Sequence, residues 1–278
     1  MKNLVVGIDI SKDSFDFCIL KSENHTIVKR GVINNTKKGI AEWLAKMNIK
    51  EMIFSMEHTG HYGFMLAWSL SQANAEFFLI NPLELKRSLG IQRGKTDVLD
   101  AFRIASYAIT NKHKLKPYNM PTEALRKLKV LMAARERFVK ISVQIKNSLK
   151  ANLIINETVD IMDLIRQEKM QIESIENTIK GLEKQMLEII KSNTNLKVNY
   201  DKISQVIGVG PITAIKCITE TDNFIRFSNA RKFSCHCGLA PFQYQSGSSI
   251  KGSTKTHYLR DKSLKAIAAH GTSFSSTS

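Results

Sequence analysis

The chain has 278 residues, 43% hydrophobic and 24% charged, a composition that excludes intrinsic disorder and a length that accommodates two domains. Forty-one Lys and Arg residues against 25 Asp and Glu give a formal net charge of +16, and the excess is spread along the whole chain. A folded protein that is basic throughout most often meets a polyanion, so we expect a nucleic-acid partner rather than a membrane surface.

Targeting and redox features point to the cytoplasm. The sequence has no apolar stretch long enough to span a membrane, and the first predicted strand follows Met1-Lys2 directly. Four cysteines give no disulfide framework in a chain of this length, and the Cys-His-Cys spacing at 235–237 is too tight for a zinc site. We therefore expect a cytoplasmic protein with no membrane partner.

Residues 1–118 predict alternating strands and helices. Apolar stretches at 4–10, 15–20 and 26–34 are separated by short polar turns, which indicates three antiparallel strands. Thr36 then caps a helix, and a strand at 51–57, a helix at about 62–74, a strand at 76–80 and a helix at about 96–110 follow. This order predicts a five-stranded mixed α/β sheet covered by helices, as in the ribonuclease-H-like fold.

Residues 119–199 predict long helices. The stretch 122–192 contains no proline, and a turn at 156–160 divides it into two helices. The first helix carries a rough apolar stripe. The second helix carries a coiled-coil seam with spacing 3-4-3-4-3, made of Ile172, Ile175, Ile179, Leu182, Met186 and Ile189. This seam is either buried inside an antiparallel hairpin or joins two copies of the chain, and the pattern fits both.

Residues 200–278 open with a segment that predicts two helices joined by a tight turn. The sequence ISQVIGVGPITA (203–214) places Gly208 and Gly210 in that turn. A helix–hairpin–helix of this kind presents backbone N–H groups and a helix N-terminus to a phosphate without reading bases. A purely structural corner between two helices has the same pattern.

Four carboxylates stand where chemistry is expected. Asp9 lies within an apolar strand and Glu57 ends another, and strand carboxyl ends form the ligand crevice of open α/β sheets. Asp97 and Asp100 are three residues apart at the start of a predicted helix and therefore share a face. Each acid alone fits an ordinary explanation, a solvated strand end or a helix dipole. Together they would converge on Mg²⁺ or Mn²⁺, and two such ions would support in-line phosphoryl transfer.

The segments around these acids resemble those of a known family. GIDISK (7–12), EHTGHY (57–62) and KTDVLDA (95–101) are similar to the D, E and D-x-x-D motifs of the DEDD insertion-sequence transposases, recombinases guided by an RNA encoded by their own element. The C-terminal part resembles the same family at GVGPITA (208–214), GLAP (238–241) and the Ser-Gly pair at 246–247. The resemblance implies a RuvC-like domain over 1–118, a helical coiled-coil region over 119–199 and a small, mostly helical transposase domain over 200–278.

The resemblance also implies roles and partners. Ser246 would be the nucleophile that forms a covalent phosphoserine, with Ser248 and Ser249 as alternatives, and the four acids would be the catalytic metal ligands. DNA, a guide RNA and further copies of the chain, as a homodimer or tetramer, would be the partners. We expect nucleic-acid contacts at the two turn glycines and at basic residues in or beside the motifs, namely Lys95, Lys251, Lys255 and Arg260.

Two other functions remain open. One is a metal-dependent nuclease of the resolvase type, in which water attacks the phosphate. The other is an inactive nucleic-acid-binding remnant, because residues 271–278 form a Ser/Thr-rich tail where family members carry more helix. Residues 256–258 also read Thr-His-Tyr where the family usually has Gly-Asn. We therefore expect a truncated or frameshifted product.

Overall fold

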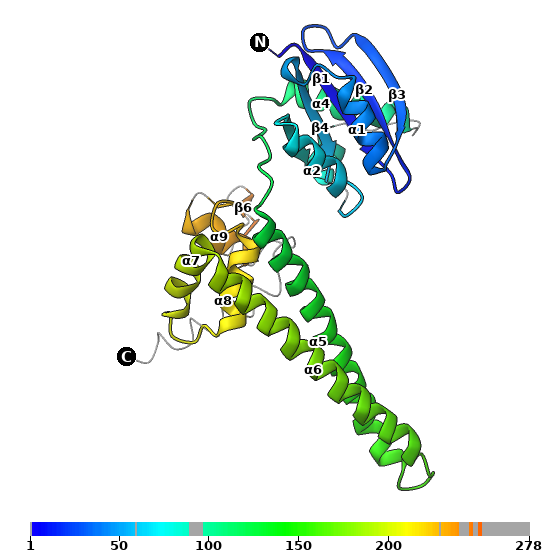
Figure 1. The fold of residues 1–278 in the computed structure, drawn as a ribbon, viewed down its shortest axis with the longest axis vertical. Coiled ribbons are helices and arrows are strands. Elements are labelled where there is room, and N and C mark those ends of the chain that lie inside the picture. Colours follow the sequence, from blue (N-terminus) through cyan, green and yellow to red (C-terminus); the bar gives the residue numbers. More distant parts are fainter. Residues whose placement is uncertain are drawn as a thin grey trace. The chain divides into compact units, whose positions relative to one another are not determined.

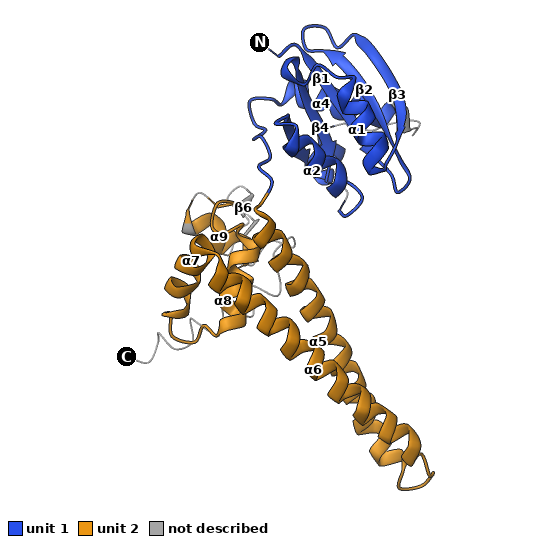
Figure 2. Ribbon diagram, viewed as in Figure 1, with its two compact units in different colours: residues 1–120 blue, residues 121–278 orange. Residues whose placement is uncertain are grey.

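The structure is a computed structural model that describes residues 2–58, 60–88, 97–227, 229–238, 245–246 and 250–251. At positions 97, 98, 230, 245, 246, 250 and 251 it describes the backbone alone. The chain forms two compact units, residues 1–120 and 121–278 (Figure 2). The boundary expected at residue 199 lies inside the second unit and stays a prediction.

The first unit contains a five-stranded mixed sheet in the order β3-β2-β1-β4-β5 (Figure 1). β1 (Leu4–Ile10), β2 (Ser14–Lys21) and β3 (Ile27–Asn34) are antiparallel neighbours. β4 (Met52–Glu57) runs parallel to β1, and β5 (Glu76–Ile80) runs parallel to β4. The predicted strands and the mixed sheet are therefore confirmed.

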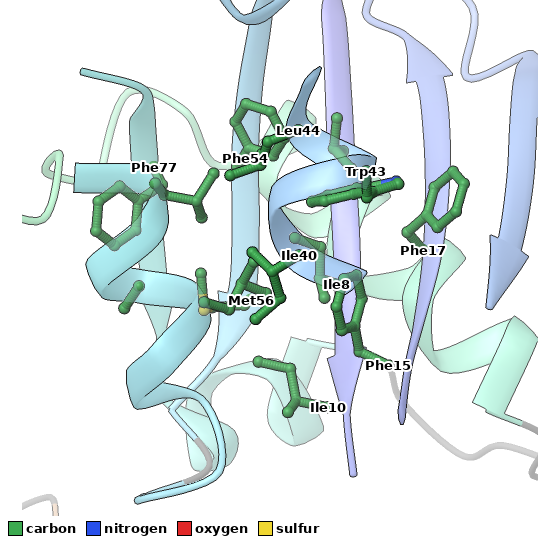
Figure 3. Packing of buried hydrophobic residues seen from close by; sticks show 14 of the residues in the cluster. Ile8, Ile10, Phe15, Phe17, Ile40, Trp43, Leu44, Phe54, Met56 and Phe77 are labelled. Carbon is green, nitrogen blue, oxygen red and sulfur yellow. The ribbon is translucent and has the colours of Figure 1, made fainter. Parts of the chain in front are cut away.

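Helices cover both faces of this sheet. α1 (Lys37–Ala45) and α2 (Phe64–Gln72) lie over one face, and α4 (Asp97–Thr110) packs on the other. Thr36 caps α1 as expected, because its Oγ1 accepts a hydrogen bond from the Gly39 N–H at 3.1 Å. Trp43 of α1 is the centre of the first core, where its ring packs against Phe15, Phe17 and Phe54 (Figure 3).

The sequence pattern does not indicate two short elements of this unit. α3 (Pro82–Ser88) follows β5 directly, and a 3₁₀ turn (Ile49–Glu51) precedes β4. Asn81-Pro82 follows the predicted strand 76–80 directly and begins α3. The Asn81 side chain accepts from the Leu83 N–H at 2.9 Å, and proline is well suited to the first helical position.

The second unit is built on a long antiparallel helical hairpin (Figure 1). α5 (Glu123–Ile155) and α6 (Met162–Ser192) are joined at the predicted turn. Partners later in α5 pair with partners earlier in α6, which establishes the antiparallel direction. These contacts are Arg135–Glu183 at 2.7 Å, Lys146–Glu176 at 2.6 Å and Ser148–Glu168 at 2.6 Å.

The hairpin buries the predicted heptad seam in part. Within one chain Met186 is fully buried, whereas Ile172, Ile175 and Ile179 remain partly exposed. The hairpin arrangement is therefore present in a single chain. A coiled coil between two copies stays a prediction.

Three further helices follow the hairpin. α7 (Thr194–Ser204) and α8 (Pro211–Glu220) pack against its base, and α9 (Ala230–His236) comes after them. β6 (Gln245–Ser246) and β7 (Ile250–Lys251) form a two-stranded antiparallel ladder. Among the helices in the described ranges, none combines the length and apolar character needed to cross a bilayer. Among the described residues, the hydrophobic cluster at the base of the hairpin contains Leu125, Leu128, Met132, Met186, Ile190, Leu196, Ile215 and Ile218.

Candidate active site

Asp9 and Glu57 occupy equivalent places on neighbouring parallel strands. The last residue pair between β1 and β4 is Ile8 with Met56, so the two acids come next on their strands. Side chains alternate along a strand, and Ile8 and Ile10 belong to the core under α1 and α2 (Figure 3). Asp9 therefore belongs to the opposite face, which α4 covers. Both acids are half-buried.

Gly7 allows α4 to pack directly on this face. A Cβ at Gly7 would lie 2.1 Å from the Ala101 carbonyl oxygen and 2.4 Å from the Ala105 nitrogen. Only a residue without a side chain permits so close an approach of helix to strand. The position of α4 over β1 is thereby fixed two residues before Asp9.

The direction of α4 follows from a contact at its other end. Ser106 Oγ lies 2.7 Å from Nδ1 of His25, which follows the end of β2. That end of β2 is beside the start of β1, because Leu4 pairs with Lys21. The C-terminal half of α4 therefore lies at the amino end of β1, and its N-terminus lies at the carboxyl end, beside Asp9.

The start of α4 carries the other two predicted acids. Asp97 is its first residue, described by its backbone, and Asp100 follows in the first turn. Asp100 Oδ1 accepts from Nη1 of Arg103 at 2.7 Å. The structure thus brings Asp9, Glu57 and the N-terminus of α4 to one end of the sheet, with Asp9 on the face that α4 covers.

The chemistry of these donors fits a hard divalent cation, but the described side chains do not form a complete ligand set. Carboxylate oxygens are the ligands that Mg²⁺ and Mn²⁺ prefer. Among the described side chains, which leave out that of Asp97, no three His, Cys, Asp or Glu groups lie close enough to hold one ion. The role of the four acids as metal ligands therefore stays a prediction.

Asp16 is an additional acid at this place and is not among the four predicted from the sequence. It pairs directly with Asp9 across the antiparallel β1–β2 ladder, and it is also half-buried. Directly opposed residues of a ladder project on the same face, so Asp16 lies on the face of Asp9. The sequence feature that could have indicated Asp16 is an acid between two apolar residues, Phe15 and Phe17, both buried in the structure. Asp9 lies in the same way between Ile8 and Ile10.

The predicted nucleophile belongs to the second unit. Ser246 lies in β6, where its backbone pairs with Ile250 of β7, and Lys251 is the other residue of β7. The alternatives Ser248 and Ser249 lie outside the described residues. So do three of the basic residues expected to contact nucleic acid, which are Lys95, Lys255 and Arg260.

The predicted glycine turn joins two helices as expected. Gly208 has a φ of +84°, a left-handed conformation that favours glycine, and Gly210 precedes Pro211 at the first position of α8. Ile207 beside them is 80% exposed. No side chain of the described residues caps the N-terminus of α8, a geometry suited to an anion.

Behind this turn, α8 carries a buried lysine. Lys216 Nζ pairs with Glu136 of α5 and lies 3.2 Å from Glu220 Oε1. Burial opposes the charge of Lys216, but the hydrogen bonds and charges of the two glutamates outweigh it and raise the pKa of Lys216 above its ordinary value. With Lys129 and Arg226 these groups line a cavity of about 170 Å³. The network fixes α8 to the hairpin.

Comparison with known proteins identifies the family. Residues 6–155 match the family model of DEDD transposases of the IS110 type, described as "Transposase", and residues 200–274 match that of the transposase IS116/IS110/IS902 family. Pilin gene-inverting proteins of Moraxella lacunata and Moraxella bovis are each 26% identical over 276 residues, which cover 96% of this chain and 81% of theirs.

Two solved structures of Thermus thermophilus RuvC, one in complex with a Holliday junction substrate, also align. They are 13% and 14% identical to this chain, cover 41% of it and 99% of their own length, and give a TM-score of 0.32. The family models match both the acid-bearing segments and the glycine–serine segment of the C-terminal part. The chain therefore belongs to the IS110 family of transposases.

Proposed function

We propose that this protein is a DNA recombinase that cuts DNA strands and rejoins them to new partners. One structural observation carries the proposal: Asp9 and Glu57 lie at the carboxyl ends of neighbouring parallel strands, and α4 begins at the same end with Asp97 and Asp100. Membership of the transposase family supports it. The relatives named pilin gene-inverting proteins support it as well, since inverting a gene requires strands to be cut and rejoined.

The four carboxylates would hold Mg²⁺ or Mn²⁺, which when bound polarises phosphate oxygens and stabilises the charge of an in-line displacement. The fold of the chain positions these carboxylate ligands. Asp9 and Glu57 are fixed by a hydrogen-bonded sheet, and Asp97 and Asp100 by a helix packed on Gly7. Sites supported by strands and helices are held more accurately than sites on loops.

Ser246 is the proposed nucleophile. A bond forms between its Oγ and the phosphorus as the bond from phosphorus to the leaving sugar oxygen breaks, and the serine proton passes to that oxygen, which leaves as a hydroxyl. The phosphoserine conserves the energy of the broken bond. A hydroxyl of another DNA strand can therefore attack it and complete the exchange.

We propose DNA and a guide RNA of the element as partners, contacted through the charged surface. The backbone N–H groups at the N-terminus of α8, which follow Gly208 and Gly210, would bind phosphate oxygens. The basic residues would neutralise the negative charge of the nucleic-acid backbone. We expect RNA to copurify with the protein from cells that carry the whole element. We also expect the protein to have the mass of a dimer or tetramer in solution. The basic residues proposed for this role are Lys95, Lys251, Lys255 and Arg260.

The test is covalent capture of DNA. Ser246→Ala should abolish the protein–DNA adduct yet bind DNA and RNA nearly as well as the natural protein, because one hydroxyl adds little to a large charged interface. Ser248→Ala and Ser249→Ala are matched controls that should retain the adduct. An adduct formed by Ser246→Ala would transfer the role to one of these serines. Cleavage without any adduct would indicate the resolvase-type nuclease, and binding without cleavage the inactive remnant.

A mixing experiment tests where the site is completed. Ser246 and the four acids belong to different compact units, so the proposed site is formed either within one chain or between two copies. Asp97→Ala should abolish the reaction through loss of a metal ligand. Strand transfer restored in a mixture of Ser246→Ala and Asp97→Ala proteins would show a site shared between copies. An inactive mixture would show a site completed within one chain.

A further inference from the structure

Arg103 and Asp100 form an ion pair at the start of α4. Arg103 Nη1 lies 2.7 Å from Asp100 Oδ1, and the two side chains are only 17% and 21% exposed. Asp100 immediately precedes Ala101, and Arg103 immediately precedes Ile104; both of these following residues are buried against the sheet. The pair therefore lies at the edge of the contact between helix and sheet, at the end that carries the proposed site.

A second ion pair with the same spacing is far more exposed. Arg166 and Asp163 on α6 are also three residues apart, but their nitrogen–oxygen distance is 3.1 Å and their side chains are 70% and 91% exposed. Exposed pairs of this kind contribute little, because water and salt screen them. In a mostly buried pair, by contrast, removing one partner leaves the other charge uncompensated.

We infer that Arg103 is a positioning residue that holds the Asp100 carboxylate in the orientation in which it binds the metal, an inference that rests on the proposed function. A charge-assisted hydrogen bond fixes one carboxylate oxygen and so restricts rotation of the short aspartate side chain. Arginine is charged at every relevant pH, so Arg103 can donate this bond throughout the pH range of the experiment. Groups that orient a metal ligand in this way typically change metal affinity about 10–100-fold when removed.

The experiment measures binding of Mn²⁺ to the full chain by titration calorimetry, without DNA, and so does not depend on activity. Arg103→Met should bind Mn²⁺ about 10–100-fold more weakly than the natural protein. Arg103→Lys, which restores a single charged donor, should recover most of that loss. Arg166→Met removes the same chemistry from the exposed pair and should bind normally. If Arg103→Met fails to give a folded circular dichroism spectrum, Arg103→Gln, which keeps an amide donor, replaces it.

A double-mutant cycle shows whether Arg103 acts through Asp100. In the Asp100→Asn background, Arg103→Met should have no further effect on Mn²⁺ affinity, because the carboxylate that it orients is gone. Unchanged or tighter binding by Arg103→Met, or an equal loss in both backgrounds, would overturn the inference. If the natural protein bound no Mn²⁺, the metal site of the proposed function would fail with it. If the natural protein bound Mn²⁺ and Arg103→Met bound it equally, the positioning role alone would be wrong.

Discussion

Replacing Gly7 with alanine tests whether the close approach of α4 to β1 sets the geometry of the site. The added Cβ would lie 2.1 Å and 2.4 Å from backbone atoms of Ala101 and Ala105, whereas ordinary contacts begin at 3.4 Å. Backbone atoms cannot rotate away, so α4 must withdraw by about 1 Å, and overpacking of this kind costs about 1–3 kcal/mol. The free energy of unfolding of the first unit should fall by that amount.

The same shift should affect the reaction, because α4 carries Asp97 and Asp100. A misplacement of about 1 Å at a catalytic group costs roughly 100-fold in rate. Urea unfolding followed by circular dichroism measures the first effect, and the rate of covalent capture of DNA measures the second. The matched control is Gly181→Ala on α6, where a Cβ meets none of the described atoms within 4 Å. That change should stabilise the helix by about 1 kcal/mol and leave the rate unaltered. A Gly7→Ala protein with natural stability and rate would refute the close packing.

Further predictions concern charge. Affinity for DNA should fall by about 1,000-fold between 50 and 200 mM salt if about six phosphates are contacted, and a flat affinity would show that the charge of +16 only aids solubility. Lys216→Met should lower the free energy of unfolding by about 1–3 kcal/mol, because Glu136 and Glu220 lose their buried partner. Burial opposes the charge of Lys216, but the glutamates raise its pKa, so its stabilising effect is complete below the ordinary lysine value of 10.5 and is lost as the pH rises through the higher folded pKa. Urea midpoints between pH 9 and 12 should therefore fall in the natural protein relative to those of Lys216→Met.

The sheet could be predicted because its strands alternate in a simple way. Asp9 between Ile8 and Ile10 marks both a strand and a face, and the short turns between the first three strands require them to be antiparallel. α3 could not be predicted in this way, because Asn81-Pro82 is compatible with a strand end as well as a helix start. When the following helix is short, the local sequence does not distinguish a strand end from a helix start.

The site was predictable only as far as the strand order. That order places Asp9 beside Glu57, but the close contact at Gly7 and the anchor between His25 and Ser106 are tertiary facts that no local pattern contains. The partner of Asp100 is another example, since i,i+3 spacing alone does not distinguish a buried pair from an exposed one. The seam of α6 is similar, because its heptads fit a hairpin and a dimer equally well.

The hairpin also limits how relatives of different size can arise. Each residue advances a helix by about 1.5 Å, and the apolar stripe repeats every seven residues, so matched losses of seven residues from α5 and α6 shorten the arm by about 10 Å and keep the facing stripes aligned. A loss of two or three residues from one helix alone would rotate its stripe away from its partner and uncouple pairs such as Arg135–Glu183 and Lys146–Glu176. Insertions and deletions in this arm should therefore occur in heptad units on both helices together, or be confined to the six residues between Ile155 and Met162.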